Sequence, residues 1–72
     1  MSDYGGLIVA EYEIKVREKL KEYGCNFTRR GRGDHDIWFS PMTNHTFPVD
    51  SVIKSRHMAN LIMKQAGIKY HF

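Results

Sequence analysis

The Gly31-Arg32-Gly33 turn in the middle of the chain constrains the fold more than any other sequence feature. The six residues on each side of it, 25–30 and 34–39, contain aromatic or β-branched side chains and no glycine or proline. Short segments of this kind that flank a glycine turn are typical of a β-hairpin. We therefore expect two antiparallel strands joined by a three-residue loop.

The loop length also predicts which side chains share a face of the hairpin. The expected cross-strand pairs are Arg30 with Asp34, Arg29 with His35, and Phe27 with Ile37. The apolar pair then shares its face with His35 at the end of the hairpin. Trp38 falls on the opposite, outer face with Asp34 and Asp36, where it either packs locally or anchors a partner.

Helical periodicity is found on both sides of the hairpin. Residues 7–23 lack glycine and proline, carry an apolar stripe at helical spacing and are followed by Gly24, a typical helix stop. A second helix is expected from Arg56 to Ala66, with Ser55 as its N-cap and a Schellman ending at residues 67–68. The stripes consist of Val9, Tyr12, Val16, Leu20 and Tyr23 in the first helix, and Ala59, Ile62, Met63 and Ala66 in the second.

A third strand, residues 45–49, follows a turn at residues 40–44, and Pro48 argues that this strand lies at a sheet edge. The expected order is helix, three antiparallel strands, helix, an α+β fold in which both helices cover one face of the sheet. A chain of 72 residues has room for a single domain, 1–72, with a thin core. Residues 1–6 are expected to form a flexible N-terminal extension.

Charge and cysteine content narrow the class of protein. Eleven Lys and Arg against eight Asp and Glu give a net charge of +3, which favours polyanionic partners. Cys25 is the only cysteine, so no internal disulfide forms and a reducing cytoplasm is expected. No apolar run approaches the ~20 residues that span a bilayer, and the N-terminus does not resemble a signal peptide, so neither membrane insertion nor secretion is expected.

His35 is the candidate catalytic residue, because it follows a turn that carries Arg29, Arg30 and Arg32. Histidine transfers protons near neutral pH, and arginine binds a phosphodiester through paired hydrogen bonds. RNA is cleaved without metal when a base removes the 2′-hydroxyl proton and cations stabilise the phosphorane charge. A half-buried strand histidine, bonded to a neighbouring aspartate or to backbone, is the alternative interpretation, and the residues alone leave both open.

A second group of basic residues, Lys54, Arg56 and His57, lies at the expected start of the second helix. Helix N-termini attract anions, so basic side chains there suggest a phosphate partner, although a solvated basic surface is the alternative. The four histidines and Cys25 lack the spacing of metal ligands, so no metal site and no cofactor are expected. The predicted RNA-binding residues are therefore Arg29, Arg30, Arg32, Lys54, Arg56 and His57.

Several of these motifs, taken in order, resemble the HicA family of bacterial toxins over about residues 16–68. They are Tyr23-Gly24-Cys25-Asn26-Phe27, Arg29-Arg30, Gly33-Asp34-His35-Asp36-Ile37-Trp38, Lys54, and Leu61-Ile62-Met63-Lys64-Gln65-Ala66-Gly67-Ile68. The resemblance implies a double-stranded-RNA-binding-domain-like fold and an mRNA interferase whose catalytic histidine is His35. Asp34 replaces the serine that usually precedes this histidine, which adds a negative charge beside the expected phosphate site.

The expected function is therefore that of a toxin from a type II toxin-antitoxin system, a metal-independent endoribonuclease that cleaves mRNA. The resemblance implies a HicB-like antitoxin as partner, with the free chain monomeric and the complex a hetero-oligomer. The alternative is a non-catalytic RNA-binding module that recognises duplex shape with the same basic surface. A third possibility is an interaction protein whose outer sheet, with Trp38, binds another protein.

Overall fold

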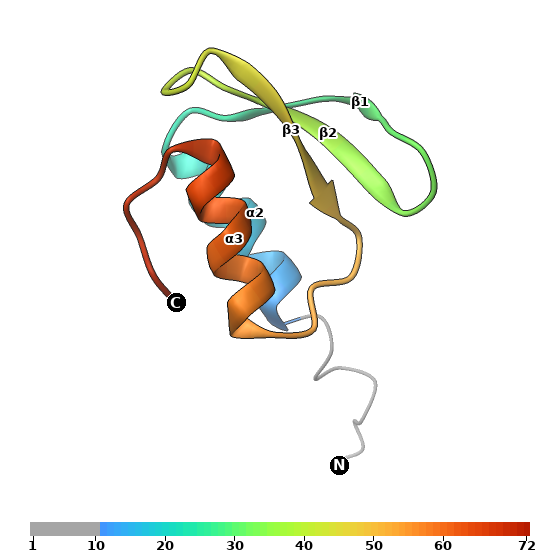
Figure 1. Cartoon of the computed structure of the whole chain (residues 1–72), viewed down its shortest axis with the longest axis vertical. Helices are drawn as coiled ribbons and strands as arrows, with labels where there is room; N and C mark the ends of the chain where they lie inside the picture. Colours follow the sequence, from blue (N-terminus) through green and yellow to red (C-terminus); the bar gives the residue numbers. More distant parts are fainter. Residues whose placement is uncertain (1–10) are drawn as a thin grey trace.

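The computed structural model describes residues 11–72, which form a helix, three strands and a second helix in that order (Figure 1). The elements are α2 (Glu11–Glu22), β1 (Asn26–Arg30), β2 (His35–Ser40), β3 (His45–Asp50) and α3 (Arg56–Ala66). This order confirms the predicted α+β layout. The expected N-terminal extension, and the expected start of the first helix at Leu7 with Val9, lie outside the described residues.

The second helix, α3, begins and ends where the sequence predicts. The Ser55 side chain caps its first turn by accepting a hydrogen bond from the Met58 N–H at 3.2 Å. At the other end Gly67 has a φ of 79°, and the N–H groups of Gly67 and Ile68 donate to carbonyls of the last helical turn. The predicted stripe is buried and consists of Ala59, Ile62, Met63 and Ala66.

The first helix, α2, contributes a narrower apolar face than its periodicity predicts. Val16 and Leu20 are completely buried, whereas Tyr23 is 42% exposed because it follows the last helical residue. The assignment of Tyr23 to the buried stripe is therefore wrong. Ile14, which lies outside the stripe, is also exposed.

The three strands form one antiparallel sheet in the order β1-β2-β3, so β3 is an edge strand, as Pro48 predicts. The β2–β3 register places Trp38 opposite Phe47, and both side chains are buried. Val49 points to the same side and is fully buried. This face of the sheet therefore forms one wall of the core.

The predicted facing of β2 is wrong. Trp38 lies on the core face at 3% exposure, in an edge-to-face contact with Phe27 at 6.4 Å between ring centroids. His35 and Ile37 lie on the opposite, open face, because successive strand residues alternate. Trp38 therefore packs in the core and is not an anchor for a partner on an outer surface.

The predicted register of the β1–β2 hairpin is also wrong. Arg29 lies opposite Ile37 and Arg30 opposite Asp36, not opposite His35 and Asp34. The loop is longer than three residues, and the register shifts between Phe27 and Arg29. The shift places Arg29 on the open face and Arg30 on the core face.

The two helices lie side by side against one face of the sheet, and the β1–β2 hairpin extends beyond them (Figure 1). Every residue of β1 is exposed, so the core lies under β2 and β3. The core residues are Val16, Leu20, Cys25, Trp38, Phe47, Val49, Ile53, Ala59, Ile62, Met63, Ala66 and Ile68. In the described part of the chain, neither helix is long and apolar enough to cross a membrane.

Candidate functional site

His35 is the first residue of β2 and lies on the open face of the sheet with 48% of its side chain exposed. Its Nε2 atom is 2.9 Å from Oδ1 of Asp50, and its Nδ1 atom is 3.2 Å from the carbonyl oxygen of Arg32. A carboxylate and a carbonyl oxygen therefore hold the ring from two sides while the rest of it faces solvent.

Backbone hydrogen bonds of the hairpin place the His35 ring. The N–H of Gly31 donates to the His35 carbonyl at 2.8 Å, and the N–H of His35 donates to the Arg32 carbonyl at 3.3 Å. On the other side, β3 runs antiparallel to β2 with Asp50 directly opposite His35. Side chains directly opposite each other in an antiparallel pair are close enough to interact, so the register itself forms the His35–Asp50 pair.

Asp50 is the functional residue that sequence reasoning missed. The predicted third strand ends at Val49, one residue too early, so Asp50 had no assigned partner. Pairing Ser40 with His45 across the second turn and counting back along both strands places Asp50 opposite His35. That register was the signal that could have identified it.

The two acceptors decide what the imidazole can do in this arrangement. A neutral imidazole has a single N–H and can donate to only one of the two oxygens, whereas an imidazolium can donate to both. The carboxylate of Asp50 also balances the positive charge of that form. The site is therefore suited to hold an oriented, proton-loaded ring that can donate a proton or bind an anion.

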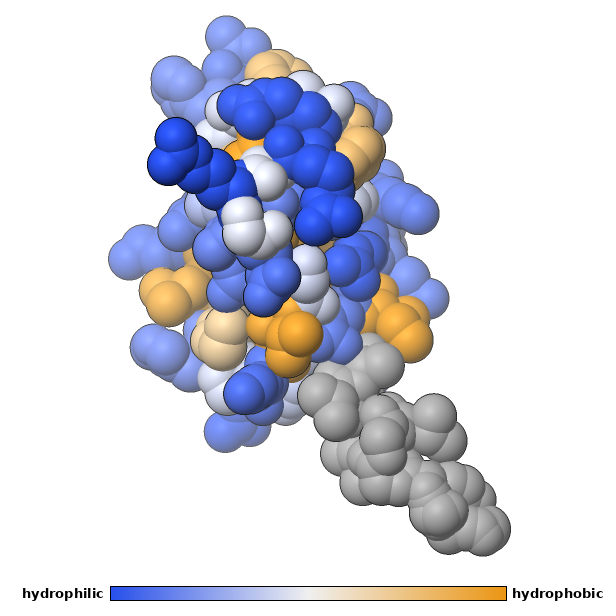
Figure 2. Space-filling view, turned by 90° about the vertical axis from the view of Figure 1, so that its right-hand side faces the viewer, coloured by the Kyte–Doolittle hydropathy of each residue, from blue (hydrophilic) through white to orange (hydrophobic). Residues whose placement is uncertain are grey.

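The hairpin arginines surround this ring with positive charge. Arg29, Arg30 and Arg32 are all exposed, and Arg29 shares the open face with His35. Arg30 forms an ion pair with Asp36, with Nε 3.1 Å from Oδ1, so part of its charge is already balanced. The side of the molecule that carries the hairpin is largely hydrophilic (Figure 2).

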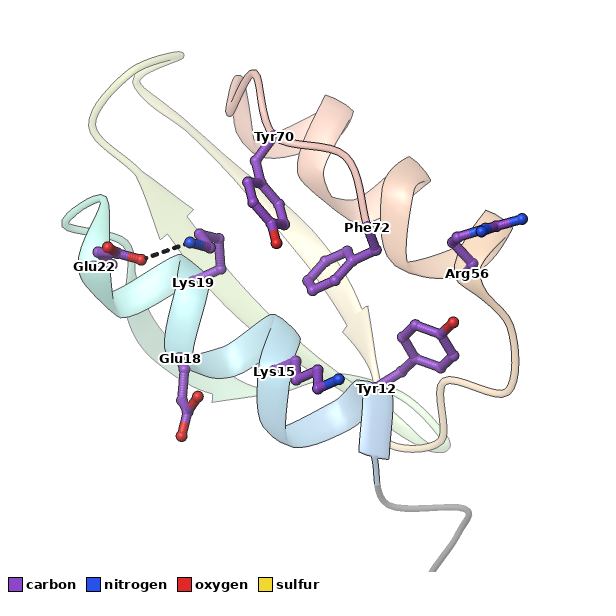
Figure 3. A pocket seen from close by; sticks show the side chains of 8 residues that line it. All are labelled: Tyr12, Lys15, Glu18, Lys19, Glu22, Arg56, Tyr70 and Phe72. Atoms are coloured by element: carbon purple, nitrogen blue, oxygen red, sulfur yellow. Dashed lines mark ion pairs between the residues drawn. The ribbon is translucent and has the colours of Figure 1, made fainter.

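The second basic group lies in a different part of the fold. Lys54 is exposed in the loop before α3. Arg56 lines a groove of about 450 Å³ between α2, α3 and the C-terminal segment, beside Tyr12 and Phe72 (Figure 3). His57 lines another groove, on the side of α3 that faces the end of the chain. Neither groove includes a hairpin arginine among the described residues that line it.

No protein family, curated protein or solved structure gives a significant match to this chain. The functional argument therefore depends on the geometry of the site and on the motifs in the sequence.

Other reactive side chains do not form a competing site. Across residues 11–72, no three His, Cys, Asp or Glu side chains come together as a group that could hold a metal ion. Cys25 is 3% exposed, and burial raises the pKa of its thiol. A buried thiol of raised pKa is a poor nucleophile, which agrees with its predicted role as a small apolar residue.

Proposed function

We propose that this chain is a HicA-type toxin, a metal-independent endoribonuclease that acts on mRNA in the cytoplasm and is restrained by a HicB-like antitoxin. The observation that carries the proposal is the exposed His35 ring, oriented by Asp50 and the Arg32 carbonyl at the arginine-rich end of the sheet. Proton transfer by a positioned histidine next to phosphate-binding cations is the minimum that metal-free RNA cleavage needs.

In the proposed reaction, the 2′-oxygen of a ribose attacks the adjacent phosphorus and the bond to the 5′-oxygen of the next nucleotide breaks. The His35 imidazolium donates a proton to that leaving oxygen, and the 2′-hydroxyl proton passes to water. Arg29 and Arg32, on or beside the open face, are placed to balance the charge that builds up on the phosphorane. The products are a 2′,3′-cyclic phosphate and a free 5′-hydroxyl.

The His35→Gln variant tests this assignment. Because Gln has no titratable ring, we expect RNA cleavage in EDTA to fall by about 10²- to 10⁴-fold, the usual contribution of acid–base catalysis. Single-stranded and duplex RNA serve as substrates, and mass spectrometry detects the cyclic phosphate. His45→Gln removes an exposed strand histidine of the same sheet and is the matched control. Wild-type cleavage by His35→Gln would refute the proposal.

A non-catalytic RNA-binding module is the second candidate, favoured by the occupation of both His35 ring nitrogens. In that case the imidazolium is one more cation for a phosphate, and RNA is retained but stays intact. Arg30→Gln would then lower the salt dependence of binding by about one unit of slope per lost phosphate contact. The same EDTA incubation separates the two functions, since only the first produces fragments.

A further inference from the structure

A groove of about 660 Å³ runs along the exposed side of α3 and under the C-terminal segment. In Figure 1 that segment turns back beside α3 after the helix ends. The groove is lined by His57, Asn60, Leu61, Lys64, Gly67, Ile68, Lys69, Tyr70 and His71. None of these residues belongs to the hairpin that carries His35.

The groove combines exposed apolar surface with basic residues. Leu61, in the middle of α3, is 45% exposed, and Tyr70 is 36% exposed, so both offer apolar area to a partner. Lys64 and Lys69 stand beside them and are exposed. No acidic residue lines the groove, and the sequence contains no Asp or Glu after Asp50. The surface is therefore positively charged around an apolar centre.

The aromatic ring in the groove is poorly placed to stack on a nucleic-acid base. The Lys19 ammonium lies 4.2 Å from the Tyr70 ring centroid, and Phe72 meets Tyr70 edge to face at 5.0 Å (Figure 3). The hydrogen bond from Lys19 to Glu22 raises the pKa of Lys19, which keeps this ammonium charged above the ring. Single-stranded RNA is bound by open aromatic faces, which this contact takes away.

From this combination we infer that the groove binds an acidic segment of a partner protein, which places a large apolar side chain on Leu61 and carboxylates next to Lys64 and Lys69. A buried apolar anchor with a charged rim is the usual composition of such an interface. The complementary charges would favour acidic segments over neutral or basic ones. This surface is additional to the proposed RNA site and does not depend on it.

A titration monitored by the NMR amide signals of the full chain tests the inference. The probe is a short acidic peptide with a single leucine, and its matched counterpart has lysine in place of each acidic residue. We expect the acidic peptide to shift the amide signals of Leu61, Lys64 and Lys69 and to leave those of the hairpin unchanged. The basic peptide should produce no shifts.

Charge reversal at the rim supplies the second measurement. Lys64→Glu combined with Lys69→Glu should weaken binding of the acidic peptide by about tenfold or more, because two favourable charge contacts become repulsive. Lys21→Glu, an exposed reversal on α2, is the control and should leave the affinity unchanged. RNA cleavage should be the same in both variants, so failure of this inference is distinguishable from failure of the nuclease proposal.

Three results would overturn the inference. The first is the absence of shifts with the acidic peptide, and the second is a set of shifts that lies outside the groove. The third is displacement of the peptide by a single-stranded oligouridine that shifts the same groove signals, which would make the groove a nucleic-acid site.

Discussion

Asp50 acts on the proposed chemistry through His35 and is therefore a positioning residue. Its carboxylate holds Nε2 at 2.9 Å, and both side chains remain partly exposed, at 37% for Asp50 and 48% for His35. Exposed ion pairs of this kind add little to stability, on the order of 1 kcal/mol or less. The conformation of the ring, more than the stability of the fold, is what this pair controls.

The Asp50→Asn variant separates positioning from binding. Asn retains an oxygen that can accept from Nε2 but lacks the charge that balances an imidazolium, so we expect kcat for RNA cleavage to fall by less than about 10²-fold with KM unchanged. Asp50→Glu should restore part of kcat. Arg29→Gln should instead raise KM, since it removes a cation from the open face. A rise in KM alone for Asp50→Asn would contradict the positioning role.

The end of α3 illustrates how backbone conformation and packing combine in one short element. Gly67 adopts a φ of 79°, and a Cβ atom there would lie 2.9 Å from Cγ2 of Thr43 in the β2–β3 turn. The same turn is tied to the helix by Ser40, whose hydroxyl donates to the Ala66 carbonyl at 2.6 Å. The helix ending therefore also fixes the neighbouring turn of the sheet.

Gly67→Ala tests this double constraint. We expect a loss of more than about 1–2 kcal/mol in the free energy of unfolding, since the left-handed conformation alone costs an L-residue that much. The contact with Thr43 adds to the loss. Gly33→Ala is the matched control, because Gly33 has a φ of 60° but no atom within 4 Å of the added Cβ. Urea unfolding measures both, and equal losses would contradict the steric contribution.

The elements could be predicted from local sequence, but the facing of β2 could not. Ser55 and Gly67 mark the limits of α3 directly, because capping depends on neighbouring residues only. In β2, alternation alone favours Ile37 as the core residue, and the register shift after Phe27 is invisible in the sequence pattern. The core face is set by the pairing of Trp38 with Phe47, which depends on β3.

The candidate site divides in the same way. His35 and the hairpin arginines stand close together in the sequence, so their chemistry could be predicted from their types and spacing. Asp50 could not be identified without the β2–β3 register, because it joins the site through cross-strand pairing. Arg56 and His57 are adjacent in sequence, yet they line two different grooves, since successive helical residues point in different directions.

One buried carboxylate connects the helix layer with the segment that links the sheet to α3. Glu13 on α2 is only 7% exposed, and its Oε2 atom accepts a hydrogen bond from the Ile53 N–H at 2.7 Å. Ile53 itself is completely buried. A buried backbone N–H without a partner is costly, so Glu13 supplies the acceptor that this loop needs in order to enter the core.

Substitution of Glu13 tests how strongly this contact joins the layers. Glu13→Ala leaves the Ile53 N–H without its acceptor, and we expect it to lower the free energy of unfolding by about 1–3 kcal/mol. Glu13→Gln keeps an amide oxygen at the same reach and should lose clearly less. Urea unfolding gives the two values, and hydrogen exchange at the Ile53 amide should accelerate in the Ala variant. Equal losses in both variants would show that the charge of Glu13, and not its role as an acceptor, stabilises the loop, since Gln preserves the acceptor and removes only the charge.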